Sequence, residues 1–150
     1  MKKLIYLILI AAVFTACGKK SNKEMLVGKW TTTDIKLAGD QTMKDFDKYK
    51  DRLKNIVEFK TDGTFNWSLC GENNTSKTGT FKITDKDGKE DESGSFVLVS
   101  QANSNGDKKE EKFFEIVSVD KNEFIAKNLL EELSRALNGN VPIYTYKREE

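Results

Sequence analysis

The sequence predicts a mainly β protein, an eight-stranded antiparallel up-and-down barrel with two helices. From residue 55 onward, apolar residues recur at alternate positions in successive segments, which is the period of a strand with one buried face. Short separators rich in Gly, Asn, Asp and Lys divide these segments, so consecutive strands are expected to pair as hairpins. The apolar period becomes helical at residues 42–54 and again at 129–138.

The N-terminal segment has the pattern of an export signal. Met1 is followed by two lysines, and residues 4–16 carry no charge, as in a secretory signal peptide. This apolar run is too short to cross a membrane as a helix, which needs about 20 residues. We therefore expect the N-terminal segment to be removed on export.

The stretch FTAC, residues 14–17, resembles the lipobox of bacterial lipoproteins, with Phe14 where that family favours leucine. The resemblance implies that residues 1–16 are removed and that Cys17 becomes the first mature residue and carries a covalent lipid with acyl chains such as palmitate. Residues 17–24 are then expected to form a tether and residues 25–150 to form the folded domain. Two or more acyl chains anchor a protein stably, so the lipid bilayer is an expected partner. The implied location is a membrane of the bacterial cell envelope, the outer membrane being favoured over the inner one.

Composition narrows the class of protein. The chain has 25 basic and 24 acidic residues, so its charge gives no reason to expect nucleic acid as a partner. Its 150 residues are enough for one domain. With Cys17 carrying lipid, Cys70 has no cysteine left to pair with, and we expect it to be a small, half-buried residue without a disulfide.

We expect eight strands along the chain. Residues 30–37 form a β-prone stretch rich in threonine. A hairpin follows, in which NIVEF and TFNWSL flank a Thr-Asp-Gly turn. The later strands are expected at residues 78–84, 94–102, 111–119 and 123–128, and in the closing segment VPIYTYKREE, where Pro142 stands at the strand entrance.

The two helices interrupt this meander. Residues 42–54 space apolar side chains three to four apart, which predicts an amphipathic helix in the first connection. Residues 129–138 repeat the pattern with leucines and stop at Asn138 and Gly139, so a short helix precedes the last strand. A hairpin-linked meander of eight strands removes its edges by closing into a barrel, and a two-sheet β-sandwich is the alternative architecture.

Several short motifs resemble the lipocalin-like domain of small bacterial lipoproteins. They are GKW at residues 28–30, FKTDGTF at 59–65, GTF at 79–81 and YTYK at 144–147. The resemblance implies a structural role for Gly28 and Trp30, with the indole plugging one barrel end and its N–H bound to a carbonyl. It also implies that the first-connection helix is a lid over the open mouth, with Phe46 and Tyr49 on its apolar face.

The leading functional hypothesis is a membrane-anchored, non-enzymatic binding protein that takes a small apolar or amphipathic ligand into its barrel. The chain has no histidine and lacks the motifs of phosphate loops, nucleophile elbows and metal sites, so we expect no cofactor, metal or catalytic residue. The alternative is a cell-envelope protein-interaction module, an inhibitor or assembly accessory, with a solidly packed barrel. The candidate ligand-binding residues are the inward set of the first hairpin and its neighbour: Val57, Phe59, Phe65, Trp67, Phe81 and Ile83.

Overall fold

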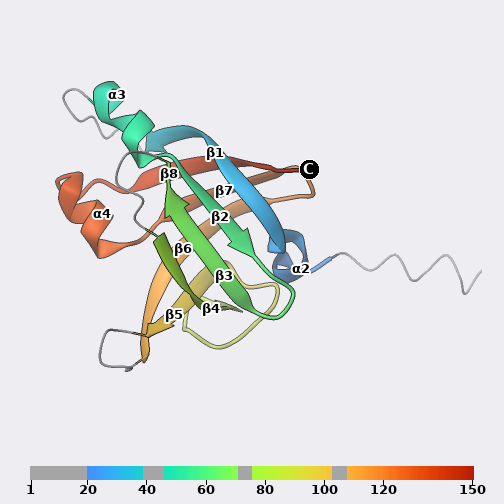
Figure 1. Ribbon diagram of the computed structural model, residues 1–150. Helices are drawn as coiled ribbons and strands as arrows, with labels where there is room; N and C mark the ends of the chain where they lie inside the picture. The colour runs from blue at the N-terminus through green and yellow to red at the C-terminus, as the bar shows by residue number, and fades with distance from the viewer. Residues whose placement is uncertain (1–19, 39–45, 71–75, 103–107) are drawn as a thin grey trace, which may run out of the picture.

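The computed structural model describes residues 20–38, 46–70, 76–102 and 108–150. Within these residues, eight strands form a closed barrel in which each strand pairs antiparallel with the next and the last pairs with the first (Figure 1). The predicted up-and-down barrel is therefore confirmed, and the sandwich alternative is excluded. The strands are β1 (Gly28–Leu37), β2 (Asn55–Phe59), β3 (Thr64–Leu69), β4 (Ser76–Thr84), β5 (Phe96–Ala102), β6 (Lys108–Val119), β7 (Glu123–Asn128) and β8 (Pro142–Arg148).

The first hairpin has the register that its alternating sequence predicts. Val57 pairs with Trp67 and Phe59 pairs with Phe65, so all four side chains enter the core from one face. Gly63 adopts φ +81° in the turn, where glycine is favoured. The Asp62 carboxylate accepts hydrogen bonds from the Thr64 hydroxyl and backbone N–H, and these bonds hold the pKa of Asp62 below its ordinary value.

Two bulges in β6 explain a stretch of sequence that breaks the alternation. The pairing with β5 skips Phe113, so the adjacent Phe113 and Phe114 both lie in the core with no exposed surface. The pairing with β7 skips Val117, which is 53% exposed. A bulge places two residues of one strand opposite a single residue of its partner. The barrel stays closed across both bulges.

The segment predicted as a tether over 17–24 differs from this expectation, because a helix, α2 (Asn22–Leu26), begins inside it. Ser21 and Glu24 cap the helix reciprocally, each side chain bound to the other's backbone N–H. The Asn22 amide donates to the Gly94 carbonyl at 2.9 Å, and the Lys23 ammonium lies 2.9 Å from Glu92. These contacts fix α2 against the β4–β5 connection, so the folded domain begins near Ser21.

The first connection contains α3 (Phe46–Tyr49) and a 3-10 helix, η2 (Lys50–Leu53). They cover residues 46–53 of the predicted helix 42–54, whose residues 42–45 lie outside the described residues. The predicted helix 129–138 is shorter, as α4 (Glu131–Ala136), because Asn138 and Gly139 both have positive φ and end it. Figure 1 shows α2 at one end of the barrel and α3 and α4 at the other.

Candidate functional site

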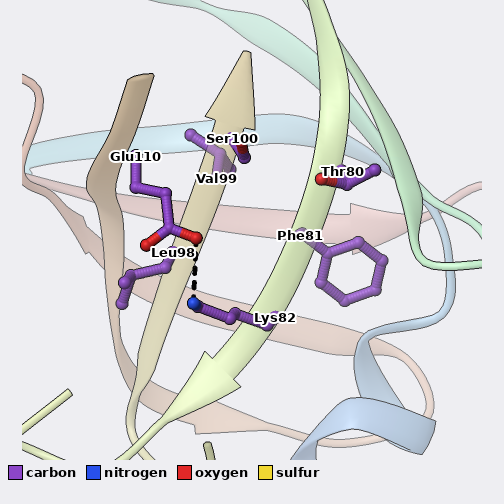
Figure 2. Close-up of a pocket in the computed structure, with 7 residues that line it drawn as sticks. All are labelled: Thr80, Phe81, Lys82, Leu98, Val99, Ser100 and Glu110. Carbon is purple, nitrogen blue, oxygen red and sulfur yellow. Dashed lines mark hydrogen bonds and ion pairs between the residues drawn. The ribbon is translucent and has the colours of Figure 1, made fainter. Parts of the chain in front are cut away.

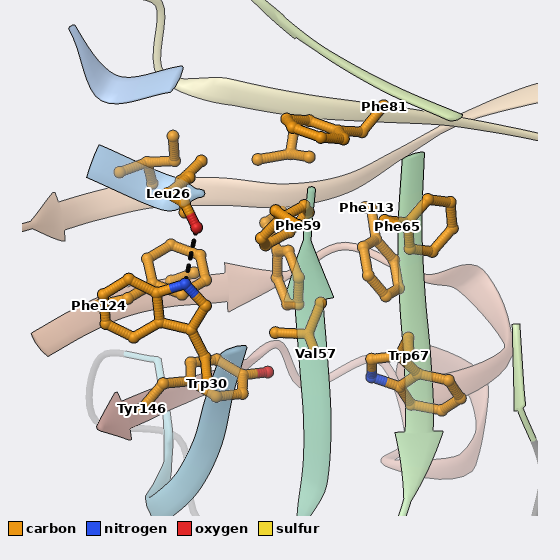
Figure 3. Close-up of a cluster of buried hydrophobic side chains, with 14 of the residues drawn as sticks. Leu26, Trp30, Val57, Phe59, Phe65, Trp67, Phe81, Phe113, Phe124 and Tyr146 are labelled. Atoms are coloured by element: carbon orange, nitrogen blue, oxygen red, sulfur yellow. Dashed lines mark hydrogen bonds between the residues drawn. The ribbon is translucent and has the colours of Figure 1, made fainter. Parts of the chain in front are cut away.

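The barrel is tightly packed around its middle. All six candidate ligand-binding residues belong to one buried aromatic and aliphatic cluster: Val57, Phe59, Phe65, Trp67, Phe81 and Ile83. Figure 3 shows Val57, Phe59, Phe65, Trp67 and Phe81 within this cluster. The rings of Phe59 and Phe81 lie 4.8 Å apart between centroids, and those of Phe65 and Phe113 lie 5.8 Å apart. Such spacings are those of rings in direct contact, so these aromatic side chains pack as core.

The end of the barrel beside α2 is closed, and Trp30 closes it. Its indole is fully buried, and its Nε1 donates a hydrogen bond to the Leu26 carbonyl at 2.7 Å (Figure 3). Leu26 is itself fully buried beside the ring. Gly28 adopts φ +142° at the start of β1, and a Cβ there would collide with the guanidinium of Arg148. The two residues of the expected signature therefore lie in the same closed end.

The opposite end, which we call the mouth, contains an apolar pocket of about 180 Å³. Its walls come from η2, β3, β4, the β7–β8 connection and β8. The lining residues are Leu53, Trp67, Leu69, Lys77, Leu130, Leu133, Ala136 and Tyr144. Of the six candidate ligand-binding residues, Trp67 is the one that reaches this pocket. The indole Nε1 of Trp67 is buried and has no hydrogen-bond acceptor among the described residues.

A buried polar network connects strands β1, β2 and β8. The Tyr146 hydroxyl donates to Asn55 Oδ1 at 3.0 Å, and the Thr32 hydroxyl donates to the Asn55 carbonyl at 2.8 Å. Burial raises the pKa of Tyr146 well above its ordinary 10.0, and burial also raises the pKa of Tyr144. Both phenols are therefore neutral at physiological pH, so neither Tyr144, which lines the pocket, nor Tyr146 carries a charge.

One wall of the mouth is polar. Lys77 pairs with Trp67 across β3 and β4, which places both side chains on the inner face of the barrel. The Lys77 ammonium lies 3.7 Å from Glu111 of β6, and the Gln101 side chain of β5 donates to the same carboxylate at 3.2 Å. The Lys77 and Glu111 side chains are only 17% and 26% exposed. An apolar pocket thus stands beside an inward-facing, partly buried ion pair.

A second hollow, of about 80 Å³, lies on the outer wall of the barrel (Figure 2). Its lining residues are Thr80, Phe81, Lys82, Leu98, Val99, Ser100 and Glu110. The Lys82 ammonium pairs with Glu110 at 2.9 Å and joins β4 to β6 across β5. Because a water molecule occupies about 30 Å³ in the liquid, this hollow suits a few waters, and the mouth is the better candidate for a ligand.

The two expected lid residues have different placements. Phe46 of α3 is half-buried and packs against the core cluster, while the side chain of Tyr49 lies outside the described residues. The neighbouring Leu53 of η2 lines the pocket. The sequence-based candidate list omitted the leucines around α4, although Leu130 and Leu133 have the helical spacing that predicts one apolar face.

Of the two cysteines, Cys70 is described and does not line the mouth pocket. Cys17 is outside the described residues. The expectation that Cys70 is half-buried is wrong, because its side chain is exposed. Cys70 follows the last residue of β3, where the chain leaves the barrel wall, and its backbone N–H donates to the Lys54 carbonyl at 2.7 Å.

Two negative findings apply to residues 20–38, 46–70, 76–102 and 108–150. No group of three or more His, Cys, Asp or Glu residues there is arranged to hold a metal ion. Within the same ranges, no helix combines the length and apolar character needed to cross a bilayer. In comparisons with known proteins, no family model matches the chain, and no curated protein matches it either.

Proposed function

We propose that this chain is a lipid-anchored, lipocalin-like lipoprotein of the bacterial cell envelope that binds a small apolar or amphipathic molecule and catalyses no reaction. The observation that carries the proposal is the apolar pocket at the mouth of the closed barrel. A protein cavity of about 150 Å³ lined by apolar side chains binds benzene. A pocket of about 180 Å³ therefore suits one ring, or the last six or so carbons of an alkyl chain.

The position of the proposed anchor fits this role. Four peptide steps separate Cys17 from Ser21, and a chain of that length reaches about 14 Å at most. Because α2 and the mouth are at opposite ends of the barrel, a lipid on Cys17 would hold the closed end next to the membrane (Figure 1). The mouth would then face the aqueous compartment and receive its ligand from there.

The anchor is tested with a Cys17→Ser variant expressed in a bacterial host. We expect the wild-type protein to fractionate with membranes and to show an intact mass that includes acyl chains. The variant should leave the membrane fraction. A variant that stays on the membrane, or a wild-type mass without acyl additions, contradicts the anchor.

The ligand site is tested by native mass spectrometry of protein purified from its membrane with a mild detergent. We expect a non-covalent small molecule to co-purify with the wild-type protein. Leu133→Trp, which fills the mouth pocket, should abolish this adduct. Leu98→Trp on the outer wall is the matched control and should retain it. An adduct that survives Leu133→Trp contradicts the site, and the absence of any adduct contradicts the ligand-binding role.

The packed middle of the barrel favours one alternative, a cell-envelope protein-interaction module. Phe59, Phe65 and Phe113 fill space that a deep ligand would need. Under this alternative, a partner protein cross-links to the anchored wild type on intact cells, and Leu133→Trp does not change the cross-linked product. The absence of a small-molecule adduct together with an unchanged cross-link would favour the interaction module.

A further inference from the structure

One part of the mouth pocket is held firmly by the barrel. Trp67 and Tyr144 line the pocket from strands, and both belong to the buried core cluster. The ring of Trp67 lies 6.1 Å from that of Phe113 between centroids, and Tyr144 stacks on Tyr146 at 5.7 Å. Because these rings are in contact with the close-packed core, this part of the lining is fixed.

A second part of the lining comes from the segment around α4, which lies outside the ring of strands (Figure 1). This segment contributes Leu130, Leu133 and Ala136 to the pocket. Leu130 is a member of the core cluster, and Leu133 is only partly buried against it. Leu137 is buried at 3% exposure but, among the residues described, lies outside that cluster. Contact with the barrel core therefore decreases along this segment.

Both ends of α4 have the features of a hinge. Before the helix, the Leu130 N–H donates to Asn128 Oδ1 at 3.0 Å, which ties the start of the segment to β7. After the helix, Asn138 and Gly139 have φ +54° and +82°. A Cβ built at Gly139 would meet no described atom within 4 Å beyond its chain neighbours. A change of direction at this glycine therefore meets no steric obstacle.

The position of α4 in the structure, which we call closed, leaves one donor in the pocket lining unsatisfied. The buried indole Nε1 of Trp67 has no acceptor in the described part of the chain. A buried N–H without an acceptor is unfavourable, whereas the same group in contact with water is satisfied. Water that entered the pocket beside α4 would remove this cost, so the empty pocket favours some opening.

We propose that α4 is a movable wall of the mouth pocket, which turns on residues 128–130 and 138–139 and closes over a bound molecule. This inference rests on the proposed function and adds a conformational step to it. Leu133 and Ala136 contact the ligand only when α4 is closed. A ligand therefore binds the closed position more tightly and shifts the population toward it. The movable wall is separate from the lid expected in the first connection.

The test measures amide hydrogen exchange by NMR on the mature chain carrying Cys17→Ser, with and without saturating benzene. The Leu137 N–H, bonded to the Leu133 carbonyl at 3.0 Å, reports on α4. The Leu129 N–H, bonded to the Phe113 carbonyl at 2.9 Å, reports on the barrel just before the hinge. Benzene should slow exchange at Leu137 at least about tenfold more than at Leu129, because it suppresses a local opening.

Two glycines provide a matched pair of variants. Gly139 and Gly88 have φ +82° and +85°, and a Cβ at either would meet no described atom within 4 Å beyond the chain neighbours. Gly88 lies in the β4–β5 connection at the closed end of the barrel. Gly139→Ala strains the closed position of α4, so it should raise exchange at Leu137 and weaken benzene binding by about fivefold each. Gly88→Ala should change neither quantity.

Fluorescence quenching gives a second readout that does not depend on a ligand. Trp30 is fully buried at the closed end, whereas Trp67 lines the pocket. Acrylamide, a neutral quencher, should reach Trp67 when α4 is open. Gly139→Ala should therefore increase quenching, and benzene should reduce it. The two effects should disappear in a Trp67→Phe background, which assigns them to the mouth.

Each contrary outcome overturns a stated part. Unchanged exchange and quenching in saturating benzene, with benzene binding established by calorimetry, overturns closure over a ligand and leaves the proposed function standing. Unchanged exchange at Leu137 in Gly139→Ala, or an equal change in Gly88→Ala, overturns the hinge at Gly139. Failure of benzene to bind, with no co-purifying molecule, overturns the proposed function and closure over a ligand together, whereas the glycine variants still decide whether α4 moves.

Discussion

The guanidinium of Arg148 lies over the indole ring of Trp30, with its central carbon 4.2 Å from the ring centroid. Its three nitrogens donate hydrogen bonds to the carbonyls of Met25, Val27 and Lys121 at 2.6–2.7 Å. One side chain from the last strand thus joins the first strand, the segment around α2 and the β6–β7 turn. The closed end of the barrel depends on this connection between the two ends of the sequence.

Arg148→Ala is expected to lower the free energy of unfolding by about 2–4 kcal/mol. The variant removes three charge-assisted hydrogen bonds and the contact with Trp30, and leaves the freed carbonyls to water or to no partner. Urea denaturation followed by circular dichroism measures the change. Lys147→Ala is the control, because its ion pair with Glu123 is exposed and is expected to contribute about 0–1 kcal/mol. Equal losses in the two variants would contradict the role of Arg148.

Gly28→Ala is expected to destabilise the protein by about 1–3 kcal/mol. The residue has φ +142°, which side chains rarely adopt, and an added methyl group would displace the Arg148 guanidinium. The double variant with Arg148→Ala should lose less stability than the sum of the single losses, since the collision disappears with the arginine. Strict additivity in this double-mutant cycle would show that the two residues do not interact.

The Tyr146 hydroxyl is expected to link stability to alkaline pH. Burial raises its pKa in the folded state above the ordinary 10.0, so the unfolded chain loses this proton first as the pH rises. The stabilisation is complete below pH 10 and is lost progressively above it. Tyr146→Phe should reduce the slope of stability against pH in that range by up to about 1.4 kcal/mol per pH unit.

The same variant has a second expected effect at neutral pH. Removing the hydroxyl leaves Asn55 Oδ1 buried without its phenolic donor, at a cost of about 1–3 kcal/mol. Urea midpoints between pH 7 and 11 measure both effects on wild type and variant. Parallel curves for the two proteins above pH 10 would contradict the titration of Tyr146.

The barrel was predictable because the residues that specify each hairpin are close together in the sequence. Alternation around an Asp-Gly turn specifies the pairing of Val57 with Trp67, and repeated hairpins then lead to closure. The bulge at Phe113 of β6 was not predictable in the same way. Two adjacent phenylalanines break the period of two, and either Phe113 or Phe114 satisfies an alternating pattern, whereas the fold buries both.

The mouth was less predictable because its parts are distant in sequence. Leu53, Trp67 and Leu133 meet only when the β1–β2 connection, β3 and the β7–β8 connection converge, and the volume between them is set by packing rather than by pattern. Lys77 directly precedes the strand expected at residues 78–84 and ends a polar run of the kind that is typical of a turn. In the structure β4 begins at Ser76, and the pairing of Lys77 with Trp67 turns the lysine inward.

The final prediction concerns the number of reactive thiols in the lipidated protein. Cys70 is exposed, so it should react rapidly with a thiol reagent such as a maleimide in the folded state. The sulfur of Cys17 should be unreactive, because a lipid thioether leaves no free thiol. We therefore expect one labelled site per wild-type molecule and none in Cys70→Ser, with mass spectrometry as the readout. Labelling of Cys70→Ser would show that Cys17 is unmodified, and slow labelling of the wild type until it is denatured would show that Cys70 is covered.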